Sequence, residues 1–202
     1  MAKQIWKPGT ILYPVPVVMV SCGDMANSNI ITAAWTGTIN TNPAMTYVSI
    51  RKERYSHQII NKTKEFVINV TTEELAFATD WCGVKSGKDF DKFSEMKLTK
   101  EKADKLSCPI ISQSPISICC KVVDVKELGS HDMFIAEVVS TMADEKYMED
   151  GGRFDFAGSK PICYSHGEYY GLGKYIGKFG YSVKKQKSKK QKPKKQELKS
   201  KK

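Results

Sequence analysis

Short runs of β-branched and aromatic residues, separated by turn residues, dominate the chain up to about position 165. Such runs predict β-strands, because branched and aromatic side chains pack well on a pleated surface. Gly, Ser, His and Asp at positions 129–132 are typical of a turn, so the runs on either side of them are expected to form an antiparallel pair. The predicted strands cover residues 15–22, 28–36, 45–51, 65–70, 117–126, 133–141 and 161–165.

Two short helices interrupt this pattern, at residues 56–62 and 72–81. The second has a capping-box pattern at its start, with Thr71 three residues before Glu74. Many antiparallel strands with few helices favour a closed or partly closed barrel, because closure removes exposed sheet edges. A doubly wound sheet would need a helix after nearly every strand. The pattern therefore predicts a mainly β protein with short helices (α+β) arranged as a barrel.

Length and composition are compatible with a single domain. A chain of 202 residues that is 41% apolar can bury a sizeable core without disulfides. The six cysteines form no C-x-x-C pair, and adjacent Cys119 and Cys120 would face opposite sides of a strand. We expect reduced and mostly buried thiols. The sequence contains no apolar stretch long enough for a signal peptide or a membrane span, which predicts a cytoplasmic protein with no membrane partner.

The net charge of +10 comes from the C-terminal end of the chain. Of the 32 basic and 22 acidic residues, eleven lysines and one acid lie in 184–202, which leaves 21 of each elsewhere. With Leu198 as its one apolar residue, this segment cannot bury enough surface to offset its ordering entropy. We expect a domain over 1–183 and a disordered lysine-rich tail over 184–202. The tail either binds nucleic acid or an anionic membrane weakly or acts as a solubilising end.

The segment from Asn29 to Pro43, NIITAAWTGTINTNP, is strand-like but rich in Thr, Ala and Gly. Small residues and hydroxyls let a flat ligand approach the backbone and form hydrogen bonds with it. A polar edge strand ending in a turn would produce the same composition, and for this segment alone it is the commoner explanation. The segment is therefore a candidate ligand wall that needs a second observation.

The strand that follows ends in a basic turn, RKERYSH, which opens the first predicted helix. Ser56 is a candidate N-cap, and Arg51 and Lys52 flank the helix start. Free amides at a helix N-terminus, the helix dipole and a bidentate guanidinium all favour a phosphate. A solvated basic turn is the alternative.

In this order and spacing, the two segments resemble the first half of the flavin reductase-like family, and in particular the flavoredoxins. The resemblance covers about residues 10–180. Lys88 stands where flavoredoxins often carry Arg, and Ala136 stands where many members carry Gly. The segments that carry it are the small-residue strand 29–38, the Asn42–Pro43 turn, S-I-R at 49–51, E-F-V-I-N-V at 65–70, S-G-K-D-F-D-K-F at 86–93 and H-D-M-F-I-A-E-V at 131–138.

The resemblance implies an FMN-binding split β-barrel, a Greek-key antiparallel barrel that works as a homodimer. It implies that the flavin ring and ribityl chain lie along the small-residue strand, that the phosphate lies at the first helix, and that a lysine-containing loop approaches the flavin. A cation near the ring would raise the flavin's reduction potential. The cofactor-binding residues implied are Asn29, Thr32, Ala33, Ala34, Trp35, Thr36, Thr38, Ser49, Arg51, Lys52, Ser56, Lys88, Asp89 and Lys92.

Other polar residues give weaker signals. The three histidines lack metal-ligand spacing, so no metal site is expected. His131 is a candidate catalytic residue on the substrate side of the flavin, with a plain turn histidine as the alternative. Cys82 is either a redox thiol or, more commonly for such a residue, a buried structural cysteine.

The leading functional hypothesis is an FMN-dependent oxidoreductase, in which NADH, NADPH or a reduced redox protein delivers electrons through bound FMN to an acceptor. A non-enzymatic FMN electron carrier is the first alternative. A nucleic-acid-binding protein acting through the tail is the second. The neutral body, and the lack of aromatic residues among the tail lysines, argue against that second alternative.

Overall fold

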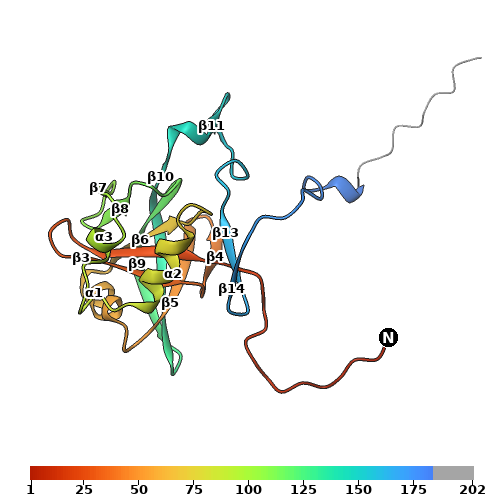
Figure 1. Ribbon diagram of the computed structural model, residues 1–202, viewed down its shortest axis with the longest axis horizontal. Coiled ribbons are helices and arrows are strands. Elements are labelled where there is room, and N and C mark those ends of the chain that lie inside the picture. Colours follow the sequence, from red (N-terminus) through yellow and green to blue (C-terminus); the bar gives the residue numbers. More distant parts are fainter. Residues whose placement is uncertain (184–202) are drawn as a thin grey trace, which may run out of the picture. The chain divides into compact units, whose positions relative to one another are not determined.

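A computed structural model describes residues 1–183 of the chain (Figure 1). The predicted lysine-rich tail at 184–202 lies outside the described residues. Met1–Leu172 form one compact unit, and a second unit begins at Gly173, before the predicted boundary at residue 183. Within residues 1–183 no helix is long and apolar enough to cross a membrane.

Seven strands form one sheet in the order β3-β2-β6-β9-β10-β5-β4, with every neighbouring pair antiparallel. A second sheet has the order β1-β13-β14, and two further pairs join β7 to β8 and β11 to β12. The strands are β1 Val15–Pro16, β2 Val18–Gly23, β3 Ser28–Ala33, β4 Thr36–Thr41, β5 Ala44–Arg51, β6 Glu65–Val70, β7 Lys100–Lys102, β8 Pro109–Ile111, β9 Ile116–Glu127, β10 His131–Ala143, β11 Met148–Glu149, β12 Arg153–Phe154, β13 Ile162–Ser165 and β14 Glu168–Gly171. The α-helices are α1 Tyr55–Thr63, α2 Ala76–Val84 and α3 Lys92–Glu95, and short 3-10 turns occupy Glu145–Tyr147 and Tyr181–Val183.

The two outer strands of the large sheet, β3 and β4, follow one another in the chain. Only Ala34 and Trp35 link them. Two linking residues span at most about 10 Å, so the sheet must curl until its edges meet. The backbone N–H of Ser49 on β5 donates to the Trp35 carbonyl at 2.8 Å and holds this link in place. The predicted mainly β antiparallel barrel is therefore confirmed.

Three local predictions are corrected. The predicted strand 28–36 ends at Ala33, because the chain crosses to the other edge of the sheet, where Thr36 pairs with Val48. The helix predicted at 72–81 begins at Ala76, since the Thr71 hydroxyl donates to the Val17 carbonyl at 2.6 Å instead of capping a helix. Ser56 is not an N-cap, because α1 begins at Tyr55 with Arg54 in the capping position.

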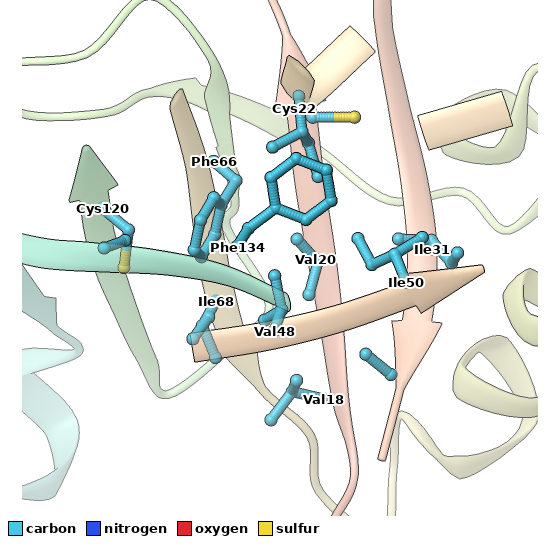
Figure 2. Close-up of a cluster of buried hydrophobic side chains, with 13 residues drawn as sticks. Val18, Val20, Cys22, Ile31, Val48, Ile50, Phe66, Ile68, Cys120 and Phe134 are labelled. Atoms are coloured by element: carbon cyan, nitrogen blue, oxygen red, sulfur yellow. The ribbon is translucent and has the colours of Figure 1, made fainter. Parts of the chain in front are cut away.

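The core lies on both sides of β2, whose six residues are all buried. Val18 and Val20 point into the barrel, where they meet Phe66 and Phe134 (Figure 2). Met19 points to the other face and packs in a cluster with residues of α2 and α3, such as Ala78 and Phe93. Alternating side chains thus attach the helices to the outside of the barrel.

All six cysteines are unpaired, and all except Cys163 are buried. Reduced, mostly buried thiols are thus confirmed. Burial raises the pKa of Cys82 to about 11, which leaves little reactive thiolate and supports a structural role.

Asn69 on β6 organises a buried polar network beside the core. Its Nδ2 donates to the Met19 carbonyl and to Ser21 Oγ, both at 3.0 Å. Its Oδ1 accepts from the Ile111 N–H at 3.0 Å and from Ser117 Oγ at 2.9 Å. One fully buried amide therefore ties β6 to β2, β8 and β9.

Replacing Asn69 with Ala leaves several buried donors and acceptors without partners. Each such group costs about 1–3 kcal/mol, so the unfolding free energy should fall by about 3 kcal/mol or more in urea denaturation. Asn61→Ala on the exposed face of α1 is the matched control and should change stability by less than about 0.5 kcal/mol. Equal stability of the two variants would show that the network carries little energy.

Candidate functional site

Two adjoining cavities run along β3. The larger has a volume of about 340 Å³ and the smaller about 200 Å³. Ile31 and Arg54 line both, so the two lie side by side, and together they are called the groove. The larger is lined by Val17, Ile31, Thr32, Ala33, Ala34, Trp35, Ser49, Ile50, Arg51, Arg54, Asp80, Gly83, Val84, His131, Tyr164 and Tyr169. The smaller is lined by Asn29, Ile31, Glu53, Arg54, Tyr55, Ser56, Cys82, Lys85, Ser86, Gly87 and Lys92.

The structure brings together nine of the residues predicted from the sequence to bind a cofactor, and the candidate catalytic residue His131. The larger cavity contains Thr32, Ala33, Ala34, Trp35, Ser49, Arg51 and His131. The smaller contains Asn29, Ser56 and Lys92. β3 and the link after it therefore form the long wall of the groove, and their binding roles remain predictions.

Five predicted residues lie elsewhere. The Thr36 hydroxyl donates to the Tyr47 carbonyl at 2.6 Å, and Thr36 and Thr38 both line a separate apolar cavity. Lys52 is held by ion pairs to Glu127 and Asp132 and lines neither part of the groove. The remaining two, Lys88 and Asp89, are exposed in the turn after α2 and also line neither part.

Small residues on β3 also let α2 pack directly against the strand. The Thr32 hydroxyl donates to the Thr79 carbonyl of α2. A Cβ placed on Gly83 would lie 3.2 Å from the Thr32 Cβ, closer than side chains normally approach. α2 therefore packs closely on β3 at Thr32, beside the groove.

The floor of the smaller cavity is a tightly packed polar contact. Asn29 Nδ2 donates to Ser56 Oγ at 2.7 Å, which joins β3 to the first turn of α1. A Cβ on Gly87 would lie 2.0 Å from Asn29 Oδ1, so a side chain at this position cannot fit without displacing the amide. The 85–87 backbone thus closes over the start of α1.

This smaller cavity suits an anion. The first amides of α1 have no partner within the helix and carry the positive end of its dipole. Arg54, Lys85 and Lys92 line the cavity, against one carboxylate, Glu53. Three cations and a helix N-terminus around about 200 Å³ form a site for a phosphate-sized group.

Lys92 is the buried cation of this set, with 4% of its surface exposed. Its Nζ donates to the carbonyls of Ile30 and Cys82, both at 2.7 Å, and so joins β3 to α2. An ammonium has three N–H donors, so one remains for the cavity. Burial lowers the pKa of Lys92 to about 8.

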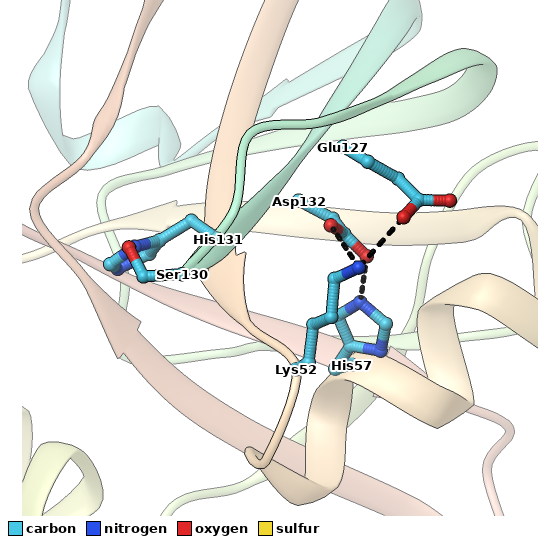
Figure 3. Close-up of polar contacts among 6 residues, drawn as sticks. All are labelled: Lys52, His57, Glu127, Ser130, His131 and Asp132. Carbon is cyan, nitrogen blue, oxygen red and sulfur yellow. Dashed lines mark hydrogen bonds and ion pairs between the residues drawn. The ribbon is translucent and has the colours of Figure 1, made fainter.

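His131 lies at the opposite end of the groove, where β10 begins opposite Arg51 of β5. Its Nδ1 is 2.9 Å from Ser130 Oγ (Figure 3). Burial, and then the charge of Arg51, lower the pKa of His131, which favours the neutral imidazole.

Sequence reasoning missed the mouth of the groove, where Asp80 of α2 meets Tyr169 of β14. The Tyr169 hydroxyl donates to Asp80 Oδ1 at 3.0 Å. Burial, and then this hydrogen bond, raise the pKa of Tyr169 to about 12, which keeps it a neutral donor. The two residues are 89 positions apart, and no local pattern links them. Arg54 was also missed, although it stands within the basic turn already singled out.

Comparison with known proteins agrees with this geometry. Residues 10–173 match the family model described as "Flavin reductase like domain". The chain belongs to the flavin reductase-like family. An uncharacterized protein of Pyrococcus abyssi (strain GE5 / Orsay) in this comparison is 30% identical over 141 residues, which cover 70% of this chain and 81% of that protein.

Solved structures extend the match to the fold of this flavin reductase-like chain. Flavoredoxin of Desulfovibrio vulgaris (Miyazaki F) is 28% identical with a TM-score of 0.84, and the match covers 91% of this chain and 100% of that one. Flavoredoxin from Methanosarcina acetivorans, at 24% identity, has the same fold with a TM-score of 0.81 over 91% and 100% of the two chains. The predicted family and its split barrel are confirmed.

Burial of Lys92 predicts an unusual pH dependence of stability. The pKa is about 8 in the folded protein against 10.5 ordinarily, so the unfolded chain binds more protons between these values. The unfolding free energy contributed by Lys92 should therefore rise with pH across this window, by up to about 3 kcal/mol. Urea denaturation of wild type and Lys92→Met at about pH 7.5 and about pH 10 measures the difference.

Lys88→Met, in the exposed turn nearby, is the control and should follow the wild-type pH dependence. If Lys92→Met also shows the wild-type pH dependence, Lys92 is not desolvated as the structure implies.

Proposed function

We propose that this flavin reductase-like protein is an FMN-dependent oxidoreductase, which passes electrons from NADH, NADPH or a reduced redox protein to an acceptor. The observation that carries the proposal is that the two cavities lie side by side and share Ile31 and Arg54. The larger accepts a flat ring system against Ala33, Ala34 and Trp35, and the smaller offers a phosphate site at the start of α1. A flavin with a single phosphate at the end of its side chain fits this arrangement of a ring cavity beside a phosphate cavity.

Bound FMN would supply the redox chemistry, and the chain would supply binding, orientation and electrostatics. Arg54, Lys92 and the α1 amides would hold the phosphate. Neutral His131 at one end of the larger cavity, and neutral Tyr169 at its mouth, would offer hydrogen bonds to the ring or to the molecule stacked on it. The positive charges of Arg51 and Arg54 in this cavity would favour electron uptake by the ligand.

A homodimer is part of this proposal. Phe77 and Val84 on α2 are 76% and 68% exposed, and Val84 lines the larger cavity. Large apolar side chains exposed beside a binding groove are typical of a surface that another chain covers. A second copy of the chain lying against α2 would finish the open side of the groove.

An electron carrier without a small-molecule substrate is the competing function. The oxidoreductase and the electron carrier are distinguished by mixing the FMN-loaded protein with NADH or NADPH without oxygen and following the flavin absorbance. Bleaching within seconds by either nucleotide would support an oxidoreductase that uses nicotinamide. Bleaching only by a reduced redox protein would leave the carrier as the function.

Arg54 should contribute more to FMN affinity than to riboflavin affinity, because only FMN carries the phosphate. Replacing it with Ala removes a charge-assisted contact worth about 1.5–3 kcal/mol, so FMN should bind about 10- to 100-fold more weakly. Riboflavin affinity should change little. Fluorescence titration with both flavins measures the two constants.

Arg51→Ala tests the residue first expected from the sequence, and Lys62→Ala in the last turn of α1 is the control for lost positive charge. Loss of FMN affinity in the control, or equal loss of both flavins in Arg54→Ala, would contradict the placement of the phosphate.

A further inference from the structure

Asp132, the second residue of β10, is a buried acid outside the groove, with 5% of its surface exposed. Its Oδ2 is 2.8 Å from His57 Nε2, and its Oδ1 is 3.4 Å from Lys52 Nζ (Figure 3). Lys52 Nζ is also 2.8 Å from Glu127 Oε2 at the end of β9. The turn end of the β9–β10 hairpin therefore holds the segment that joins β5 to α1.

The two contacts of Asp132 lie on either side of Arg54 in the chain. Lys52 precedes Arg54 by two residues, and His57 follows it in the first turn of α1. Between them the backbone forms a tight turn, in which the Arg54 N–H donates to the Arg51 carbonyl at 3.0 Å and the His57 N–H donates to the Arg54 carbonyl at 2.9 Å. One carboxylate thus fixes both ends of the turn that carries Arg54 to the groove.

The same strand end also sets the other side of the groove. Successive side chains of a strand point to opposite faces, so His131 faces the larger cavity while Asp132 faces α1. In the ladder, His131 pairs with Arg51 and Asp132 with Ile50. A shift of Asp132 relative to α1 would therefore change the spacing between Arg54 and His131.

Such a buried carboxylate is costly unless it is paired. Oδ1 finds no hydrogen-bond partner within the described part of the chain and has only the ion pair with Lys52. Packing alone would be served better by an apolar residue at this position. We propose that Asp132 is a positioning residue for the phosphate site, acting through Lys52 and His57 on Arg54 and the start of α1. This inference rests on the proposed FMN site.

Asp132→Asn is the direct test, because it keeps the shape of the side chain and removes its charge. Loosening the turn should weaken FMN binding about tenfold, the lower end of what is lost when a group that orients a ligand-binding residue is changed. Riboflavin should bind within about twofold of wild type, because it has no phosphate for Arg54 and the start of α1 to hold. Both constants are measured by fluorescence titration at one pH and salt concentration.

Two further variants separate positioning from folding. Lys52→Gln removes one of the two contacts of Asp132. The Lys52 side chain is half-exposed, so the fold should tolerate the change. FMN binding should weaken in the same selective way, by about threefold. Asp124→Asn is the matched control, since Asp124 forms an exposed ion pair with Lys126 at 2.7 Å in the same hairpin. It should bind both flavins as wild type does.

Selective loss of FMN in Asp132→Asn and Lys52→Gln, with Asp124→Asn unchanged, supports the inference. Equal loss of both flavins, or no loss of either, overturns the positioning role and leaves the FMN site intact. If Asp132→Asn does not fold, the selectivity of Lys52→Gln decides. A wild-type protein that binds neither flavin overturns the FMN site itself, and the inference with it.

Discussion

The two-residue link between β3 and β4 is the constraint on which the rest of the structure depends. Because only Ala34 and Trp35 join the opposite edges of a seven-stranded sheet, the sheet must close on itself. Closure brings β3 and β5 near one another without pairing them, and the larger cavity lies in that gap. The groove is therefore a consequence of how the barrel closes. Beside it, α2 packs against Thr32.

Positive charge is concentrated at one end of this groove, where the chain leaves β5 and enters α1. Arg54, Lys85 and Lys92 come from three separate segments and meet over the first turn of the helix. Lys92 is held by two backbone carbonyls, so its charge is fixed in place although burial opposes it. Preorganised charge of this kind binds an anion without further ordering cost. The larger cavity is lined by the aromatic side chains of Trp35, Tyr164 and Tyr169 together with Arg51 and Asp80.

Sequence patterns predicted the fold class, the barrel and the site's long wall, because β propensity and the small-residue segment are local signals. They failed where long-range contacts decide the outcome. The Thr71 hydroxyl donates to the Val17 carbonyl and so does not cap a helix. Lys52 forms an ion pair with Asp132 and does not line the groove. The Asp80–Tyr169 pair joins residues with no pattern between them. Arg54 lies within the basic turn that the sequence singles out, but N-cap preference points to Ser56, while in the structure Arg54 occupies the capping position.

Titration of the flavin-free protein with FMN and with riboflavin tests the central claim most directly. If the groove holds a ring at one end and a phosphate at the other, FMN should bind at micromolar concentrations or below, and at least about tenfold more tightly than riboflavin. The bound flavin should show a perturbed absorption spectrum, because its ring would lie against Trp35. Equal affinity for the two flavins, or no uptake of either, would contradict the account.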